Sequence, residues 1–462
     1  METLLFQGRR LLHTEIEALL RKNGHLVHEG EWDKNLKRWS QMGMIRTAAV
    51  TVDSWIFRWK CNRCGAGFQH IELQTCANCS QKCGVCTHCR QLGIARSCNE
   101  VFLFPLLSPR AIKQMEMDVS ILYSEYQKQA IQQLTDHVRS ASRILVYAVT
   151  GAGKTEMMLP IVKKALEAGE RVLWVIPRKE VVQELAKRLS DYFPQVSLAA
   201  WSSDSSTIWK DADFLISTAH QMVRFHEQFG LVIVDEVDAF PLYGNPILER
   251  AVDNALCPGG TRIYLTATPS YEMRRLVQKK KISLVVVPQR YHGRPLPIPK
   301  LYVERKLWKL FKQLKPIPVL SSFLQKVRQE QGQAFLFIPT IDRLNLVERW
   351  LHIHHPQLVS KRLESVHSRD RNRVEKVEDF RQGKTQILLT TTILERGVTV
   401  PGISVLVLGS DHRLYDQQAL LQISGRVGRS KTDLRGIVWF VGEERTEAQE
   451  RAVRETIWLN QQ

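Results

Sequence analysis

Apolar positions along much of the chain follow two alternating patterns. Short continuous runs rich in Val, Ile and Leu are typical of strands buried on both faces, whereas apolar residues every three to four positions are typical of amphipathic helices. Helical segments such as 156–168 and 180–190 separate the first set of runs. The strands predicted in this stretch are 144–149, 171–176, 213–217, 231–234 and 262–266. Repeated strand–helix–strand units predict a parallel sheet.

The same alternation resumes after residues 291–300, whose prolines predict a stiff linker. A second set of buried strands is predicted at 334–338, 386–390, 404–408 and 436–441. The predicted fold class is therefore α/β, with two tandem parallel-sheet domains. We place the first domain at residues 111–290 and the second at 291–462, after an N-terminal unit of residues 1–110 that begins with an amphipathic helix.

Eight of the nine cysteines lie in the N-terminal unit. Such clustering in a cytosolic chain indicates metal binding rather than disulfides. Cys-x2-Cys pairs present two sulfurs to one tetrahedral Zn²⁺, so eight thiols would fill two structural sites. The preferred partition puts Cys61, Cys64, Cys86 and Cys89 on one ion and Cys76, Cys79, Cys83 and Cys98 on the other.

Alternatives to two all-thiolate zinc sites stay open. His70 and His88 are possible substitute ligands, and a redox-active cluster is the less favoured interpretation. A catalytic zinc is disfavoured because no open coordination position is evident. The ninth cysteine, Cys257, is predicted to be an inert buried thiol.

The balance of charge favours an anionic partner. The 462 residues contain 65 Lys and Arg against 47 Asp and Glu, a net charge of +18, which suits a nucleic acid or an anionic membrane surface. Trp55, Phe57 and Trp59 alternate along a predicted strand. They either stack on bases or form the core of the small metal-bound unit, and we favour the core.

The sequence favours a cytoplasmic location. Residues 1–25 contain no apolar signal segment, and no run approaches the roughly 20 apolar residues of a membrane span. Peripheral docking at the inner face of the cell membrane stays open.

A phosphate-binding loop is predicted at residues 148–155, Ala-Val-Thr-Gly-Ala-Gly-Lys-Thr, which follow an apolar run and precede a helical pattern. In such a loop the backbone and the helix N-terminus approach the phosphates of a nucleotide. Lys154 would neutralise the β- and γ-phosphates of ATP, and Thr155 would bind Mg²⁺. Ala148 stands where the strict motif has its first glycine. The residues predicted to bind the nucleotide here are Thr150, Gly151, Ala152, Gly153, Lys154 and Thr155.

An acidic strand end is the second part of the predicted ATP site. Residues 231–238 form an apolar strand that ends in carboxylates. Asp235 would bind Mg²⁺, and Glu236 would orient and deprotonate the attacking water.

An arginine pair is the third part. Residues 422–429, Gln-Ile-Ser-Gly-Arg-Val-Gly-Arg, contain Arg426 and Arg429 at a spacing that suits arginine fingers on the γ-phosphate. The neighbouring glycines favour this role over a solvated basic face, because they permit close approach to a phosphate. Since Lys154 and Arg429 lie in separate predicted domains, hydrolysis is expected to require domain closure.

Taken in order, these segments resemble the motifs of superfamily 2 helicases. Residues 150–155, 235–238, 266–268 and 422–429 are similar to motifs I, II, III and VI. Further similarities, to motifs Ia, Ib, IV and V, lie at 177–178, 217–221, 335–340 and 390–397. Gln127 resembles the glutamine that reads adenine, and Gln422 belongs to the nucleotide-binding set. The resemblance implies two RecA-like domains that bind ATP and Mg²⁺.

The chain resembles one family in particular, ComFA, over nearly its whole length. Residues 148–157, 235–241 and 390–401 and the N-terminal Cys-x2-Cys-Gly unit are similar to this family of late-competence ATP-dependent DNA translocases of Gram-positive bacteria. The resemblance implies single-stranded DNA as ligand, and ComFC and the membrane DNA-uptake channel as partners. Homo-oligomerisation stays open. The chain departs from many members by having eight N-terminal cysteines rather than four, and by Thr399 where wider relatives have Asp.

The helicase resemblance also implies a path for DNA across both domains. Hydroxyls and basic side chains there hold phosphates without reading sequence, so we expect sequence-tolerant, salt-sensitive binding. Residues 266–268 are expected to couple the DNA path to the ATP site. The residues expected to contact DNA are Arg178, Thr218, Arg224, Thr340 and Thr391.

We interpret the sequence as a zinc-bearing, ATP-driven motor on single-stranded DNA. One alternative is a replication-restart or RNA helicase of the same superfamily, and the zinc unit that precedes the motor argues against the replication-restart type. The other is a non-hydrolysing, zinc-containing DNA-binding scaffold, against which the intact Lys154, Glu236 and Arg429 argue.

Overall fold

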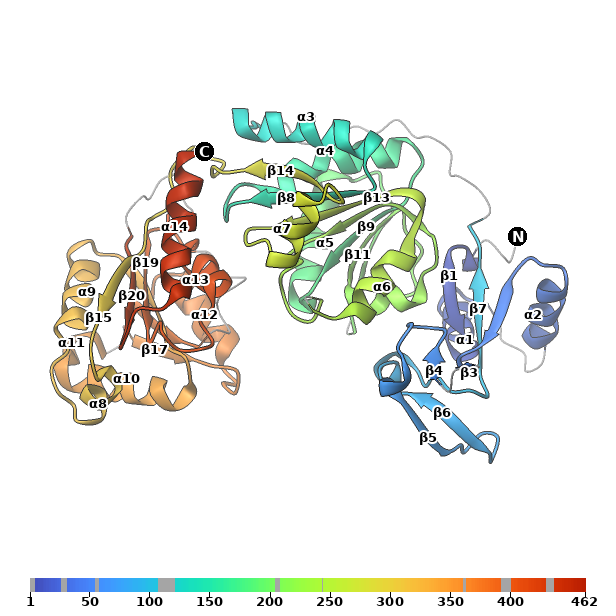
Figure 1. Ribbon diagram of the computed structural model, residues 1–462, viewed down its shortest axis with the longest axis horizontal. Coiled ribbons are helices and arrows are strands. Elements are labelled where there is room, and N and C mark those ends of the chain that lie inside the picture. The colour runs from blue at the N-terminus through green and yellow to red at the C-terminus, as the bar shows by residue number, and fades with distance from the viewer. Residues whose placement is uncertain are drawn as a thin grey trace. The chain divides into compact units, whose positions relative to one another are not determined.

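The computed structural model describes residues 5–25, 31–54, 58–106, 121–203, 208–242, 244–359, 363–391, 400–428 and 436–462. The chain divides into two compact units (Figure 1). One contains Met1–Leu122, Ala130–Val146 and Thr155–Val285, and the other contains Tyr123–Gln129, Tyr147–Lys154 and Val286–Gln462. The N-terminal residues and most of the first parallel sheet therefore belong to the same unit.

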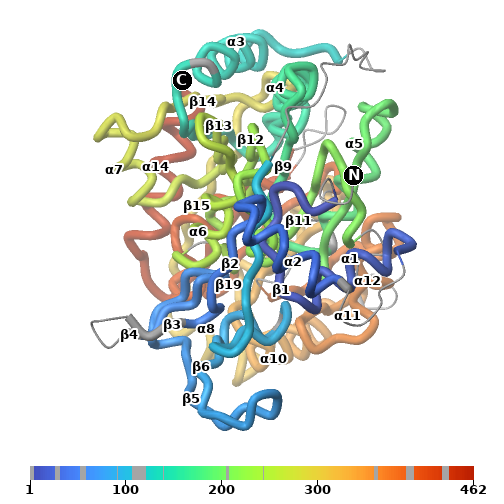
Figure 2. Tube along the Cα trace, turned by 90° about the vertical axis from the view of Figure 1, so that its right-hand side faces the viewer, coloured from blue at the N-terminus to red at the C-terminus, as the bar shows by residue number. Residues whose placement is uncertain are grey.

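The N-terminal part is built on a three-stranded antiparallel sheet in the order β1-β7-β2 (Arg9–Leu12, Glu100–Phe104, Arg46–Ala49). Helices α1 (His13–Lys22) and α2 (Glu31–Gln41) accompany it, and Phe6 stacks on Phe104 at 4.8 Å between ring centroids. Two hairpins follow, β3–β4 (Thr51–Ser54, Arg58–Cys61) and β5–β6 (Ile71–Thr75, Lys82–Cys86). The second hairpin projects away from the three-stranded sheet (Figures 1 and 2).

Of the three aromatic residues predicted to share a strand, Trp59 lies on β4, and Trp55 and Phe57 lie outside the described residues. The Trp59 ring packs on Gly84, where an added Cβ would come within 2.7 Å of it. This contact favours the packing interpretation for Trp59.

The first parallel sheet has seven strands in the order β10-β11-β9-β12-β13-β8-β14. Helices lie on both of its sides (Figure 1) because crossovers between parallel strands commonly carry a helix. The crossover from β10 to β11 carries none in its described residues. The strands are β8 (Arg143–Ala148), β9 (Val172–Ile176), β10 (Leu198–Trp201), β11 (Phe214–Thr218), β12 (Phe229–Val234), β13 (Leu256–Thr266) and β14 (Ser283–Val287). The helices are α3 (Glu125–Ser140), α4 (Lys154–Glu167), α5 (Lys179–Tyr192), α6 (Pro246–Ala255), α7 (Tyr271–Gln278) and the short 3₁₀ helix η4 (Ala219–Arg224).

The second parallel sheet has six strands in the order β15-β20-β19-β16-β18-β17. Side chains on alternate positions of β16 enter two different cores, Leu336 on one face and Phe335 and Phe337 on the other. The strands are β15 (Lys300–Val303), β16 (Gln333–Phe337), β17 (Leu363–Val366), β18 (Ile387–Thr390), β19 (Ile403–Leu408) and β20 (Val438–Gly442). The helices are α8 (Leu307–Lys312), α9 (Pro318–Gln329), α10 (Ile341–His354), α11 (Pro356–Val359), α12 (Arg373–Arg381), α13 (Gln417–Ser424) and α14 (Glu447–Gln461).

The predicted fold class is confirmed, and each predicted strand has a counterpart in one of the two sheets. The structure adds β10, β14, β15 and β17, which the apolar pattern did not reveal. All four, β10, β14, β15 and β17, are edge strands of the sheets. The predicted linker 291–300 is corrected at its end, because Lys300 already belongs to β15. The domain boundaries themselves remain predictions.

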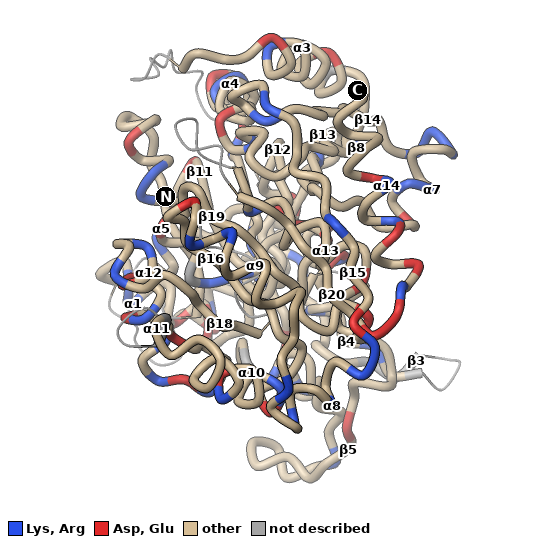
Figure 3. Tube along the Cα trace, turned by 90° about the vertical axis from the view of Figure 1, so that its left-hand side faces the viewer, with Lys and Arg blue, Asp and Glu red and all other residues tan. Residues whose placement is uncertain are grey.

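Charge is spread along the chain. Figure 3 shows Lys and Arg on many helices and loops, interspersed with Asp and Glu. Within the described residues, no helix combines the length and apolar composition that crossing a membrane requires.

Candidate ATP site and cysteine clusters

The predicted phosphate loop connects β8 to α4, as a phosphate loop requires. Gly151 and Gly153 have φ values of +81° and +75°, which glycine adopts without the steric cost of a Cβ. The Lys154 ammonium donates hydrogen bonds to the carbonyls of Ala148 (2.9 Å) and Val149 (3.3 Å). The loop therefore curls around its own lysine, at the start of a helix whose free N–H groups favour an anion.

Gln127 joins the start of α3 to this loop. Its side-chain amide donates to the Ala152 carbonyl (2.9 Å), and its side-chain oxygen accepts a hydrogen bond from the Ser124 N–H (2.9 Å). The side chain is buried, with 4% exposure. Contact between Gln127 and adenine remains a prediction, and the structure adds that this glutamine braces the loop.

The acidic segment follows β12 at its carboxyl end. The Asp235 carboxylate accepts a hydrogen bond from the Glu236 N–H (2.9 Å), and Glu236 has a φ of +47°. A left-handed conformation is unusual for glutamate and is typical of tight functional turns. Asp235 and Glu236 thus lie on a sharp turn at the carboxyl end of β12, a central strand of the sheet.

Asp238 joins this acidic segment to residues 266–268. Its carboxylate is buried and accepts hydrogen bonds from the hydroxyls of Thr266 (2.6 Å) and Thr268 (2.7 Å). Because β12 and β13 are neighbours, their carboxyl ends bring these groups together. Sequence reasoning gave Asp238 no role of its own, although its spacing of three residues from Asp235 was a signal.

The arginine segment follows α13 in the second unit. Gln422 and Arg426 are buried, with 8% and 1% exposure, and Arg429 lies outside the described residues. Arg290 donates to the carbonyls of Gly428 (2.5 Å) and Gly425 (3.3 Å). Arg290 was missed in the sequence because it stands alone before the predicted linker, and it holds the backbone on both sides of Arg426.

The residues expected to contact DNA lie at helix starts and strand ends. Arg178 and Thr218 occupy the N-cap positions of α5 and η4, and Thr340 caps α10 by accepting from the Arg343 N–H (3.4 Å). Thr391 follows β18, and most of motif V, including Thr399, lies outside the described residues. Helix N-termini offer backbone N–H groups to phosphates, and the positions of Arg178 and Thr340 suit the expected role. Thr218 is buried, with 8% exposure, at the start of a six-residue helix.

Arg224 does not fit that role. Its side chain is 8% exposed, and its guanidinium donates to Glu15 (2.6 Å) and to Gln221. The expectation that Arg224 holds a DNA phosphate is therefore wrong for this arrangement, because the group is buried against the N-terminal helix α1.

The eight N-terminal thiols form two groups of four, the same two sets as in the preferred partition. Within each group the sulfurs lie within 4.8 Å of one another. Sulfurs 2.3 Å from a tetrahedral Zn²⁺ are about 3.8 Å apart, and the pairs Cys64–Cys86 and Cys76–Cys98 are 3.6 Å apart. The thiol geometry therefore fits a tetrahedral ion in both groups, and neither His70 nor His88 belongs to them.

Strand β6 serves both groups. It carries Cys83 and Cys86, whose odd spacing directs them to opposite faces of the strand. Cys61, Cys64 and Cys89 complete one group beside the three-stranded sheet. Hydrogen bonds from Cys64 and Cys86 lower the pKa of the Cys61 thiol, and the hydrogen bonds with Cys61 raise the pKa of the Cys64 and Cys89 thiols. Burial raises the pKa of the separate Cys257 thiol to about 11, which keeps it protonated, and it is only partly buried rather than fully so.

Known families match this architecture. Residues 120–271 match the family described as the type III restriction enzyme, res subunit, and residues 316–431 match the helicase conserved C-terminal domain. The structure of RecG bound to a three-way DNA junction has a TM-score of 0.51, at 20% identity over 76% of this chain and 49% of that one. Dbp5 of S. cerevisiae, bound to RNA and ADP BeF3, has a TM-score of 0.51 at 16% identity, over 73% of this chain and 87% of that one. These two likenesses show the fold, and together with the family matches they define an ATP-dependent enzyme of the helicase class.

The remaining match identifies the family. Residues 3–103 match the competence protein ComFA N-terminal domain. The chain is 32% identical to competence protein ComFA of Bacillus subtilis, over 92% of this chain and 91% of the relative. It is 34% identical to competence protein ComFA of Streptococcus pneumoniae, over 82% and 86%. The chain belongs to the ComFA family.

Proposed function

We propose that this protein hydrolyses ATP to move along single-stranded DNA, and that this movement drives DNA uptake into the cytoplasm during competence for transformation. The observation that carries the proposal is the Asp238 bridge from the acidic segment to Thr266 and Thr268, in a chain of the ComFA family. A motor needs its ATP site joined to a segment that responds to the nucleotide. A buried carboxylate with two hydroxyl donors is a rigid joint of that kind.

In the proposed ATP site, Lys154 and the backbone of residues 150–153 hold the phosphates. Thr155 and Asp235 hold Mg²⁺, which supplies charge neutralisation when bound, and Glu236 orients the attacking water and accepts its proton. Arg426 and Arg429 stabilise the charge that develops on the γ-phosphate. In addition, Gln127 contacts the adenine, and Gln422 lies at the nucleotide.

The proposed DNA path uses helix N-termini and hydroxyls rather than base-reading side chains. Arg178, Thr218, Thr340 and Thr391 hold phosphates in it, so binding is sequence-tolerant and weakens as salt rises. The positive net charge of +18 supports a polyanionic ligand.

The two cysteine groups each hold one structural Zn²⁺ in this proposal. Four thiolates and no free position suit a structural rather than a catalytic ion. The family also suggests partners, namely a ComFC-like protein and the DNA-uptake channel, and therefore a place at the inner face of the cell membrane. Homo-oligomerisation is compatible with the proposal.

The decisive experiment measures ATPase activity with single-stranded DNA, double-stranded DNA, RNA or no polymer. We expect strong stimulation by single-stranded DNA and loss of about 100-fold or more in Lys154→Ala, because charge stabilisation at the reacting phosphate is lost. Lys163→Ala is the matched control, since Lys163 lies on the same helix and pairs only with Glu167 at 3.6 Å among the contacts seen. Equal stimulation by RNA would overturn the DNA motor, and full activity in Lys154→Ala would overturn the site assignment.

A further inference from the structure

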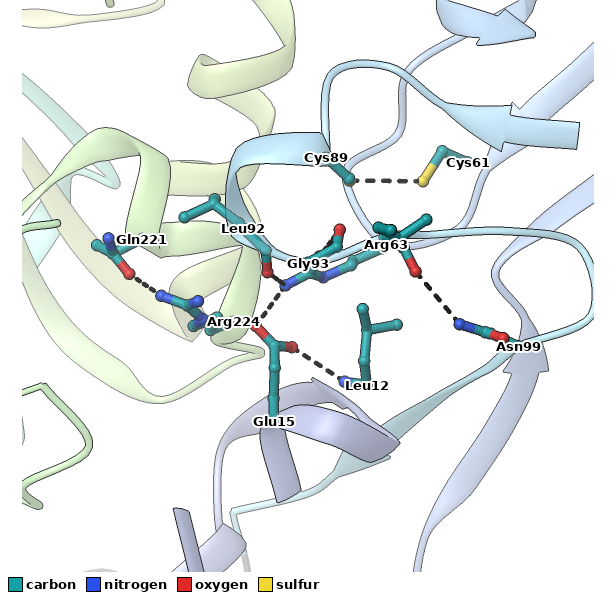
Figure 4. Close-up of polar contacts among 11 residues, drawn as sticks. Leu12, Glu15, Cys61, Arg63, Cys89, Leu92, Gly93, Asn99, Gln221 and Arg224 are labelled. Carbon is teal, nitrogen blue, oxygen red and sulfur yellow. Dashed lines mark hydrogen bonds and ion pairs between the residues drawn. The ribbon is translucent and has the colours of Figure 1, made fainter. Parts of the chain in front are cut away.

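Three buried charged residues from distant parts of the chain meet in the first unit (Figure 4). The Glu15 carboxylate on α1 lies 2.5 Å from the Arg63 guanidinium and 2.6 Å from that of Arg224 on η4. The side chains are 0% (Arg63), 6% (Glu15) and 8% (Arg224) exposed. One carboxylate oxygen therefore serves two arginines out of contact with bulk water, and the three positions depend on one another.

Arg63 lies within the first cysteine group, the one formed by Cys61, Cys64, Cys86 and Cys89. It stands between Cys61 and Cys64, and its guanidinium donates to the carbonyls of Leu92 (3.0 Å) and Gly93 (3.4 Å), just after Cys89. Arg63 thus contacts the backbone near both pairs of thiols in the group. Its position therefore depends on how well those four thiols are fixed. The thiols are joined to one another by weak sulfur hydrogen bonds, and a bound metal would fix them more firmly.

Arg224 lies three residues after the segment 217–221, which is proposed to contact DNA. It ends η4, the helix that Thr218 caps, and it holds the side chain of Gln221. Residues 217–221 resemble motif Ib, so this part of the inference rests on the proposed function. A change in Arg224 therefore reaches Gln221 and with it the segment that resembles motif Ib.

Two further contacts join the same thiol pair to the rest of the first unit. Arg250 on α6 donates to the Gly65 carbonyl (2.9 Å), and Arg10 on β1 donates to the Arg63 carbonyl (3.0 Å). Next to η4, Arg9 on β1 forms an isolated antiparallel bridge with Phe225. The N-terminal part is thus attached to the motor directly beside motif Ib.

We propose that Glu15 is a positioning residue that transmits metal binding at Cys61, Cys64, Cys86 and Cys89 to η4, and thereby sets the affinity for single-stranded DNA. With the metal bound, Arg63 is fixed, Glu15 stays between the two arginines, and Arg224 holds η4. Without it, Arg63 is released and the buried Glu15 carboxylate keeps Arg224 as its one remaining arginine partner among these contacts. Loss of one partner of a buried charge favours rearrangement of η4.

The second cysteine group provides an internal control. The hydrogen bonds seen around its thiols involve Asn78, Arg96 and Asn99, all in the N-terminal part. Metal loss there is expected to leave η4 unchanged.

The first test is hydrogen exchange of residues 217–225 in the full-length protein, which needs no DNA. Chelation of zinc, Cys61→Ser and Glu15→Gln should each increase amide exchange in this segment, and Cys76→Ser should not. Glu15→Gln keeps the side-chain volume, so its melting temperature and zinc content serve to show that the fold is retained. Unchanged exchange after chelation and in Glu15→Gln would overturn the inference.

The second test is a cycle on the dissociation constant for a fluorescent oligo-dT strand. Chelation should weaken binding of the wild-type protein about tenfold, within the usual range for coupled sites. In Glu15→Gln the same chelation should weaken binding far less, because the transmitting residue is already lost. Additive losses would overturn the proposed transmission. Absence of oligo-dT binding by the wild-type protein would instead overturn the proposed function, and the exchange result would still decide whether the metal site controls η4.

Discussion

The two cysteine groups offer the same four thiols to a metal in two different settings. The first group is buried throughout and lies beside the Arg63–Glu15–Arg224 contacts. The second contains the partly buried Cys79 and the exposed Cys98. Cys76, Cys79 and Cys83 of this group belong to the projecting β5–β6 hairpin (Figures 1 and 2), and Cys98 precedes β7. Identical ligands can therefore support different tasks, because the task depends on what the surrounding residues contact. The first group is placed to influence the motor, and the second to hold the hairpin together.

The largest expected effect is that of Cys61→Ser. We expect the zinc content to fall from two ions to one, and the free energy of unfolding to fall by more than about 4 kcal/mol, because a buried structural metal site is lost. Elemental analysis and thermal unfolding measure both quantities. Retention of two ions and an unchanged melting temperature would show that Cys61 neither holds an ion nor stabilises the fold through one.

The order of metal release sharpens the same contrast. Mild chelation should free the four thiols of the second group first and those of the first group later. The second group includes the exposed Cys98, so a chelator reaches it with less local opening. A thiol reagent at pH 8 would count the two phases. Cys257 should remain slow throughout, since with a pKa of about 11 only about one in a thousand of its thiols is ionised at that pH. Release of all eight thiols in a single phase would show that the two cysteine groups do not differ in their access to the chelator.

Cys79→Ser is the counterpart of Cys61→Ser in the second group. One zinc ion should be lost, while the main unfolding transition and the ATPase activity stay as in the wild type, because the hairpin projects from the sheet. Calorimetry and a DNA-stimulated ATPase assay provide the comparison. A fall in the free energy of unfolding equal to that of Cys61→Ser would assign both groups the same role.

Arg250→Ala should have the smallest effect. The Arg250 side chain is exposed, and its hydrogen bond to the Gly65 carbonyl is one of several contacts at the junction. Its loss should cost about 1 kcal/mol or less of unfolding free energy and leave the zinc content at two ions. A destabilisation as large as that of Cys61→Ser would show that the N-terminal part is attached to the motor mainly through Arg250 on α6 rather than through Glu15.

Much of the fold was predictable because its signals are local. Strands such as β12 and β19, buried on both faces, read as continuous apolar runs, and the parallel topology follows from the helices between them. The edge strands that escaped prediction are short, four or five residues each, and some contain exposed or polar positions. Lys300 and Val303 of β15 are exposed, for instance, and so the strand looked like part of the proline-rich linker.

The site divides in the same way. The sequence by itself predicted the phosphate loop, the acidic segment and the arginine segment, because each is a run of a few residues. The Cys-x2-Cys spacing predicted metal ligands, and the structure brings the thiols together in the two sets of the preferred partition. Only the tertiary structure decided that Arg224 binds Glu15 rather than offering its charge to a phosphate, and that Asp238 joins Thr266 to Thr268. Such pairings join residues as far apart as 209 positions. A buried charge takes the partner that packing places beside it, and that choice leaves no local pattern in the sequence.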